Sequence, residues 1–170
     1  MPDLKTSLLI CGGTIDKTYF PDRECFDFAE THWEKLIAQS RIPAGMVQTQ
    51  FVFHKDSLQM NDADREQVRA AGAEGAHERI LIAHGTSTMI TTANALEAAA
   101  PNGKTIVLFG ALLPCELIDS DAQFNFGFAM AAAQLLPPGV YIAMNGRLFD
   151  VDNVRKNREQ NRFEALSGSD

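Results

Sequence analysis

Two short stretches of the sequence place a threonine directly after glycine at the end of an apolar run. Residues 8–11 lead into Gly12-Gly13-Thr14, and residues 80–83 lead into His84-Gly85-Thr86. A threonine hydroxyl becomes a nucleophile when a neighbouring group removes its proton, and glycine leaves backbone N–H groups open to a ligand. Two such turns at one edge of a parallel sheet predict a paired hydroxyl site. The alternative is that the first turn contains glycine only for backbone flexibility.

The rest of the chain alternates between expected strands and expected helices. This alternation predicts an α/β fold in one domain: an open parallel sheet of about five strands with helices on both faces, flavodoxin- or Rossmann-like. Residues 17–28 show no clean period and are predicted to form a loop that covers Thr14. Asn61 or Asp62 is expected to cap the second helix. Strands are expected at residues 8–11, 46–53, 80–83, 105–109 and 140–144, and helices at 30–40, from 61 or 62 to the glycines at 72 and 75, at 88–100 and at 119–136.

Composition and charge exclude several classes of partner and ligand. With a net charge of −7 and no Lys/Arg-rich run, we expect neither nucleic acid nor an anionic membrane surface as a partner. No apolar run approaches the about 20 residues that span a bilayer, and the N-terminus has no signal-peptide pattern. Three separated cysteines favour a reduced, cytoplasmic protein over a disulfide framework. The four histidines lack metal-ligand spacing, so we expect neither a metal site nor a cofactor.

The expected helix at residues 119–136 is apolar almost all round, with Phe124, Phe126, Phe128 and Met130 among its residues. A helix of this kind is expected to be buried, in this case at a subunit contact. We therefore expect the protein to be a homo-oligomer.

Six stretches of the chain match one family pattern in the same order. They are Gly12-Gly13-Thr14-Ile15, residues 56–62 (Asp-Ser-Leu-Gln-Met-Asn-Asp), 84–89 (His-Gly-Thr-Ser-Thr-Met), 110–114 (Gly-Ala-Leu-Leu-Pro), 121–125 (Asp-Ala-Gln-Phe-Asn), and the run from Met144-Asn145 to Val154-Arg155-Lys156. In these motifs the sequence resembles the bacterial-type L-asparaginases and asparaginase/glutaminases. The resemblance implies that residues 1–170 form an asparaginase N-terminal-type catalytic domain, with no C-terminal domain in the chain.

The resemblance also implies a mechanism, in which a threonine attacks the side-chain amide carbon of L-asparagine, or less favourably of L-glutamine, and releases ammonia through an acyl-enzyme. A lysine that burial holds neutral can take the hydroxyl proton, and glycine-flanked N–H groups can stabilise the oxyanion. The implied catalytic residues are Thr14, Thr86, Lys156 and Tyr19. The implied substrate-binding residues are Gly13, Ser57, Gln59, Gly85 and Ser87, of which Ser57 and Gln59 fall where the family holds the substrate's α-carboxylate.

The sequence departs from the family pattern at three points. Ser87 stands where the family usually has an aspartate that binds the substrate ammonium. Tyr19 is close to Thr14 in a differently built loop, whereas the family's catalytic tyrosine lies well after the nucleophile. The chain is also short, because family members usually carry a second domain that helps to form a neighbouring subunit's site.

Two other functions remain open at this stage. One is a non-catalytic module of the same fold that binds a small amino acid, and the other is a glutaminase- or amidase-type subunit that needs a partner chain. The presence of Thr14, Thr86 and Lys156 together favours the enzyme. The structural alternatives at single residues are Thr86 and Thr88 as helix caps, His84 as a hydrogen-bonded structural histidine, and Lys156 as a solvated charge.

Overall fold

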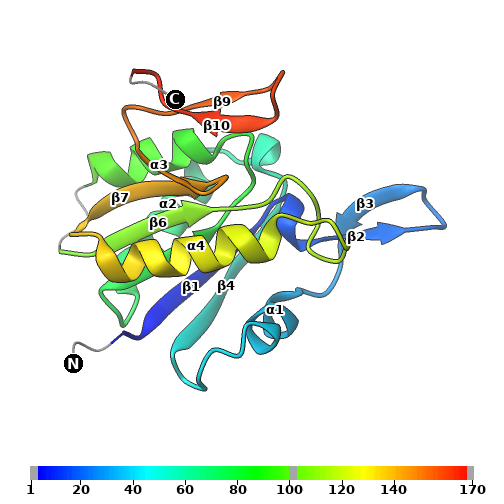
Figure 1. Cartoon of the computed structure of the whole chain (residues 1–170), viewed down its shortest axis with the longest axis horizontal. Helices are drawn as coiled ribbons and strands as arrows, with labels where there is room; N and C mark the ends of the chain where they lie inside the picture. The colour runs from blue at the N-terminus through cyan, green and yellow to red at the C-terminus, as the bar shows by residue number, and fades with distance from the viewer. Residues whose placement is uncertain (1–3, 100–102, 168–170) are drawn as a thin grey trace.

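A six-stranded sheet in the order β4-β1-β5-β6-β7-β8 forms the centre of the molecule (Figure 1). The computed structural model describes residues 4–99 and 103–167 of the 170-residue chain. The first five strands in that order are mutually parallel, and the edge strand β8 runs antiparallel to β7. The strands are β1 (Thr6–Gly12), β4 (Val47–Lys55), β5 (Arg79–Ala83), β6 (Thr105–Phe109), β7 (Gly139–Met144) and β8 (Arg147–Asp150). The predicted parallel α/β sheet is confirmed, with β8 as an additional strand.

Helices cover both faces of this sheet, so its central strands are apolar on both sides. Successive residues of β5 show the two layers, because Leu81 belongs to one apolar core and Ile82 to the other. The helices are α1 (Trp33–Gln39), α2 (Asp62–Glu74), α3 (Met89–Ala98) and α4 (Ala122–Leu135). The core that contains Ile82 is closed by α2 and α3, and the core that contains Leu81 is closed by α1 and α4.

The ends of α2 follow the sequence prediction, whereas the end of α3 is only partly described. The Asn61 side chain accepts a hydrogen bond from the backbone N–H of Asp64 (3.0 Å), and the Asp64 carboxylate accepts one from the Asn61 N–H (2.9 Å). This reciprocal capping box fixes the start of α2, and Gly75 ends the helix. The predicted end of the next helix at residue 100 lies outside the described residues.

The predicted loop at residues 17–28 is wrong, because this segment is a β-hairpin. Its strands are β2 (Lys17–Phe20) and β3 (Cys25–Phe28), which pair antiparallel. Tyr19 lies opposite Phe26, with ring centroids 5.2 Å apart. Cross-strand aromatic pairs of this kind stabilise hairpins, and they leave little trace in a sequence without strict alternation.

A second hairpin, also not expected from the sequence, lies within the charged C-terminal segment. Its strands are β9 (Arg155–Asn157) and β10 (Arg162–Glu164), which pair antiparallel at the top of the view in Figure 1. Phe163 of β10 is buried in the same core as α2 and α3. Together with Val154, which is buried in this core directly before β9, Phe163 anchors the hairpin.

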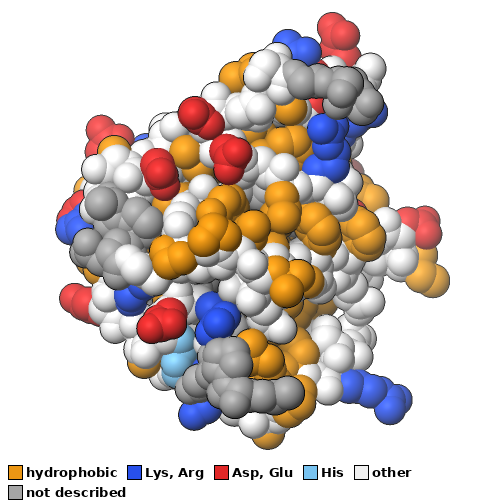
Figure 2. All heavy atoms as spheres, turned by 60° about the vertical axis from the view of Figure 1, so that its left-hand side comes forward, with side chains coloured by type: hydrophobic (Ala, Val, Ile, Leu, Met, Phe, Trp, Pro, Cys, Tyr) orange, Lys and Arg blue, Asp and Glu red, His pale blue; other side chains and the backbone are white. Residues whose placement is uncertain are grey.

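Helix α4 is buried on one face only, which corrects the prediction that the whole helix is buried. Phe126 and Ala129 are buried against the sheet, whereas Phe124 is 62% exposed and Leu135 is 84% exposed. Figure 2 shows orange side chains in a band across this face of the molecule. Within the described residues, no helix is both long and apolar enough to span a bilayer.

Candidate functional site

Three loops meet at the carboxyl end of the sheet because glycine lets their backbones touch. Gly13, which has φ +81° and ψ 177°, approaches Gly85 so closely that a Cβ on Gly13 would lie 2.5 Å from the Gly85 Cα. A Cβ on Gly85 would in turn lie 2.6 Å from the Ser57 Oγ. The structure therefore brings together Gly13, Gly85 and Ser57, which the sequence analysis places in one site.

The two threonines stand one residue beyond these glycines, at the ends of neighbouring strands. Thr14 is half-buried and begins the short 3-10 turn η1 (Thr14–Asp16) that follows β1. Thr86 is buried and follows β5. Helix α3 begins at Met89 directly after this loop, and the N–H groups of its first turn, which have no partner within the helix, favour a negatively charged ligand group nearby.

The side chain of Lys156, in β9, contacts Thr86, the second of the two threonines. Its Nζ donates a hydrogen bond of 2.7 Å to the Thr86 Oγ1. Burial lowers the pKa of Lys156, the nearby charge of Arg158 lowers it further, and Asp56 works in the opposite direction. A lysine with a lowered pKa has more of the neutral amine that accepts protons. The alternatives that treat Lys156 as a solvated charge and Thr86 as a helix cap are both wrong.

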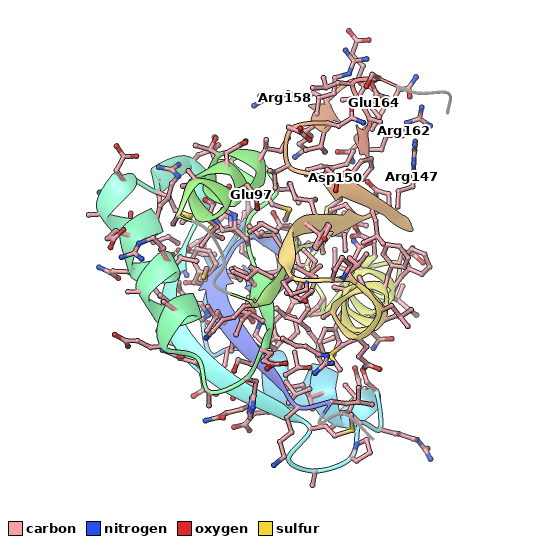
Figure 3. The ribbon with its side chains drawn as sticks, turned by 90° about the vertical axis from the view of Figure 1, so that its left-hand side faces the viewer. Glu97, Arg147, Asp150, Arg158, Arg162 and Glu164 are labelled. Carbon is pink, nitrogen blue, oxygen red and sulfur yellow. The ribbon has the colours of Figure 1, made fainter. Side chains whose placement is uncertain are left out.

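Two arginines of this hairpin, Arg155 and Arg162, pair with the buried carboxylate of Glu164. Figure 3 shows Arg158, Arg162 and Glu164 on the hairpin, at the same end of the molecule as Arg147. Arg155 donates to Glu164 over 2.6 Å. Lys156 thus lies between the exposed Arg155 and Arg158, but its own side chain points to Thr86.

Two hydrogen bonds between Ser57 and Thr88 join the turn that begins at Ser57 to the start of α3. The Thr88 hydroxyl donates to the Ser57 carbonyl oxygen (2.7 Å), and the Thr88 N–H donates to the Ser57 Oγ (3.3 Å). Thr88 is the N-cap residue of α3, but its hydroxyl does not cap the helix. Ser87, between the two threonines, is half-buried, and Gln59 is exposed in the short 3-10 turn η2 (Ser57–Gln59).

A carboxylate stands beside Ser57 and is paired with the hairpin. The Lys17 ammonium donates to Asp56 over 2.7 Å. Burial acts to raise the pKa of Asp56, but the Lys17 ammonium and the Leu58 N–H hold this pKa below its ordinary value. Asp56 therefore remains ionised near neutral pH, and its charge is felt at Lys156.

Tyr19 lies on the hairpin strand that this ion pair attaches to the site. Alternate residues of a strand share a face, so Tyr19 is on the face of β2 that carries Lys17. Its backbone N–H donates to the Glu116 carboxylate over 2.6 Å, and its ring remains 44% exposed. The structure brings the strand of Tyr19 to the site but leaves Tyr19 partly exposed to solvent.

His84 plays the structural part that the sequence suggests. Its Nδ1–H donates to the Gly85 carbonyl oxygen (2.8 Å), and its Nε2 accepts from the Thr92 hydroxyl (2.9 Å). Complete burial lowers the pKa of His84 to about 4. A neutral histidine bonded on both sides fixes the shape of the loop that carries Thr86.

Asp16 is a polar centre beside Thr14 that the sequence analysis misses. Its buried carboxylate accepts hydrogen bonds from the side chains of Thr31 and His54 and from the His32 N–H, each over 2.7 Å. These partners lie between 15 and 38 residues away in the chain, so no local pattern identifies them. Within the described residues, no group of three His, Cys, Asp or Glu side chains is arranged to hold a metal ion.

A small hollow lies next to this centre but not at Thr14. It has a volume of about 230 Å³ and lies between α1 and the segment that precedes α4. Its lining includes His32, Lys35, Cys115 and Glu116, and none of the residues that meet at the glycine contact. The candidate site is therefore the loop junction at the sheet edge, and the hollow is linked to the hairpin through Glu116, which accepts from the Tyr19 N–H.

Comparison with known proteins gives one family. The family described as "Asparaginase, N-terminal" matches residues 5–168. One subunit of the glutamyl-tRNA(Gln) amidotransferase from Methanococcus maripaludis (strain C5) is 40% identical over 89 residues, which are 52% of this chain and 20% of that protein. L-asparaginase from Thermococcus kodakarensis is 28% identical over 125 residues, which are 72% of this chain and 38% of that protein.

The solved structures agree on the fold. The thermostable L-asparaginase from Thermococcus kodakarensis has a TM-score of 0.85 at 25% sequence identity, and the match covers 97% of this chain and 52% of that one. The chain thus spans about half the length of this solved relative, and less of the curated relatives that it matches.

Proposed function

Because the chain belongs to the asparaginase family, we propose that it is an amide hydrolase that converts L-asparagine and water into L-aspartate and ammonia. The observation that carries this proposal is the 2.7 Å bond between the Lys156 Nζ and the Thr86 Oγ1. In this bond the Lys156 amine, whose pKa is lowered, contacts the Thr86 hydroxyl, and the loop of Thr86 touches the loop that carries Thr14. Proton transfer of this kind is what a threonine nucleophile requires.

In the proposed reaction, Thr14 attacks the side-chain amide carbon of the substrate. The hydroxyl proton passes through Thr86 to the neutral Lys156 amine, and N–H groups of the glycine loops stabilise the oxyanion. Lys156 then returns the proton to the leaving nitrogen, which departs as ammonia and leaves an ester on Thr14. Water attacks the ester with Lys156 again as the base, the proton passes to the Thr14 oxygen as the ester bond breaks, and L-aspartate is released.

The charged groups of the substrate have complementary partners around this centre. The Ser57 hydroxyl and the N-terminus of α3 suit the α-carboxylate, with Gln59 at the exposed rim. Ser87 offers the α-ammonium only a neutral oxygen, so we propose that Asp56 binds the ammonium. L-glutamine should react more slowly, because its extra methylene displaces the carbonyl and misplacement by about 1 Å costs about 100-fold in rate.

Ammonia release from L-asparagine by the purified protein tests the proposal. The same assay on Thr14→Ala gives the background, and L-glutamine gives the selectivity. Ammonia production that depends on Thr14 supports the amidohydrolase. Tight binding of L-asparagine in a calorimeter with no ammonia above the Thr14→Ala background would instead identify a non-catalytic amino-acid-binding module.

A second candidate is an amidase component that works with a partner chain. The similarity to one component of a glutamyl-tRNA(Gln) amidotransferase and the exposed apolar side chains of α4 favour this candidate. If it is right, the protein alone hydrolyses L-asparagine poorly, and adding the partner restores ammonia release. An isolated protein with full activity would exclude it.

We also propose that the protein is a cytoplasmic homo-oligomer. Cys11, Cys25 and Cys115 are all free thiols, as in proteins of reducing compartments. Phe124 and Leu135 give α4 an apolar surface for a second copy. Sedimentation at micromolar concentration tests the oligomer, and a monomer would reject it.

A further inference from the structure

Asp16 has a buried carboxylate with three hydrogen bonds, two residues after the proposed nucleophile. Its side chain is 1% exposed. One carboxylate oxygen accepts from the Thr31 hydroxyl and the His54 Nε2–H, and the other accepts from the His32 backbone N–H. A buried carboxylate is stable only when its oxygens are bonded in this way, so its partners are fixed in place.

The three donors come from segments that surround the β2–β3 hairpin. Thr31 and His32 lie between the end of β3 and the start of α1, and His54 lies near the end of β4. Asp16 itself closes the turn that Thr14 opens. The carboxylate thus joins the Thr14 turn, the return strand of the hairpin and the sheet edge at one point.

The same partners hold the hairpin through their rings. His54 stacks on Phe28 of β3, with ring centroids 5.1 Å apart and an interplanar angle of 18°. The His32 Nε2 bonds the Thr18 hydroxyl of β2 over 2.8 Å. Both hairpin strands are therefore fastened to residues that Asp16 orients.

We propose that Asp16 and His54 are positioning residues that fix both the Thr14 hydroxyl and the base of the hairpin. Neither residue is assigned contact with the reacting atoms. Asp16 acts through the turn that it shares with Thr14, and His54 acts through Asp16 and Phe28. This inference rests on the proposed function for its kinetic part, while its structural part stands on the contacts alone.

Four variants test the pair. Asp16→Asn replaces one acceptor oxygen by an N–H₂ group that cannot accept, so either Thr31 and His54 or the His32 N–H loses its acceptor. His54→Leu removes the donor and leaves an apolar side chain, whereas His54→Gln supplies an amide N–H that can donate to Asp16. Asp27→Asn is the matched control, because among the described residues Asp27 bonds Arg23 and Phe28, both within the hairpin, and none of the Asp16 partners.

The kinetic measurement is the split between kcat and KM for L-asparagine at a temperature where each variant is folded. Asp16→Asn and His54→Leu should each lower kcat by about 30- to 100-fold, because displacement of the nucleophile by about 1 Å has that cost, with KM changed less than kcat. His54→Gln should recover most of the loss, and Asp27→Asn should keep the parent kcat. A variant that is less stable but has the parent kcat when folded would overturn the positioning role.

Hydrogen exchange gives a readout that does not depend on activity. In Asp16→Asn and His54→Leu, amides of residues 17–28 should exchange faster, while those of β5 and β6 keep their protection. If the parent protein releases no ammonia, the proposed function fails, and the exchange data still decide whether Asp16 and His54 hold the hairpin. If Asp16→Asn does not fold, the two His54 variants decide it. Unchanged exchange in the hairpin would overturn the inference.

Discussion

The glycine turn before Thr14 and the β2–β3 hairpin after it are held in place by different means. Before Thr14, the backbones of Gly13 and Gly85 are in direct contact, and no side chain intervenes. After Thr14, the hairpin is held by side-chain bonds and stacked rings, and Tyr19 and Phe26 remain 44% and 41% exposed. The glycine contact makes the carboxyl edge of the sheet a rigid edge, which suits groups whose spacing must not change. The hairpin has fewer buried contacts, which suits a segment that must move to admit a substrate.

The largest effect should come from the rigid edge. Thr14→Ala should lower kcat for L-asparagine by about 10⁴- to 10⁶-fold, the cost of removing a nucleophile. The melting temperature should not change. Thr91→Ala, the same substitution at an exposed position of α3, is the control for ammonia release. A loss of only a few-fold at Thr14 would show that the nucleophile is elsewhere.

Lys156→Met should lower kcat by about 10²- to 10⁴-fold with a small change in KM, because proton transfer acts in the transition state. The parent kcat should rise with pH as Lys156 loses its proton, and the lowered pKa moves this rise below the pH at which an exposed lysine titrates. The rise should vanish in the variant. Lys35→Met, on the exposed side of α1, should keep the parent profile, and an unchanged kcat in Lys156→Met would remove Lys156 from the mechanism.

Gly13→Ala tests the packing of the edge itself. A Cβ would meet the Gly85 backbone, and the φ and ψ of Gly13 are accessible almost only to glycine. Overpacking and backbone strain together should lower the free energy of unfolding by about 2–6 kcal/mol. The contrasting variant is Gly127→Ala, since a Cβ there meets open space on α4 and should add about 0.5–1 kcal/mol. Denaturant unfolding of both proteins measures the difference, and equal stability would contradict the tight contact.

Tyr19→Phe tests the hairpin. Because Tyr19 is 44% exposed, loss of the hydroxyl should lower kcat by about 10-fold or less, which is less than a well-placed proton-transfer group contributes. Steady-state kinetics at constant pH measure the change. A loss as large as that of Thr14→Ala would mean that the hairpin closes over the substrate and that the two regions are equally rigid in the bound state.

The smallest effect should come from Ser87→Asp, which should lower KM for L-asparagine by about 5-fold, because a charge-assisted bond to the ammonium exceeds a neutral one. Succinamate, which has the amide but no ammonium, should show no such gain. The new carboxylate would add to Asp56, so a KM that is unchanged or higher for L-asparagine would show that Ser87 does not face the ammonium.

Much of the fold was predictable because short, continuous apolar runs without alternation are typical of parallel strands that are buried on both faces. The meeting of Gly13, Ser57 and Gly85 was also predictable, since each follows a strand of one sheet. The hairpin at residues 17–28 was not, because its stability depends on Asp16, His54 and other contacts across the fold. The role of Lys156 in the three-residue strand β9 was not predictable for a related reason. In the sequence Lys156 cannot be distinguished from its basic neighbours Arg155 and Arg158, which face solvent.

The bond between Lys156 and Thr86 joins residues that are 70 positions apart in the chain. During synthesis, β1, β4, β5 and β6 leave the ribosome well before β9, and contacts between distant residues form late in folding. A nascent chain can therefore possess the sheet and both threonines while it still lacks the amine. On the proposed mechanism, hydrolysis begins only once the β9–β10 hairpin has docked, so partly made chains in the cell do not consume the amino acid from which they are being built.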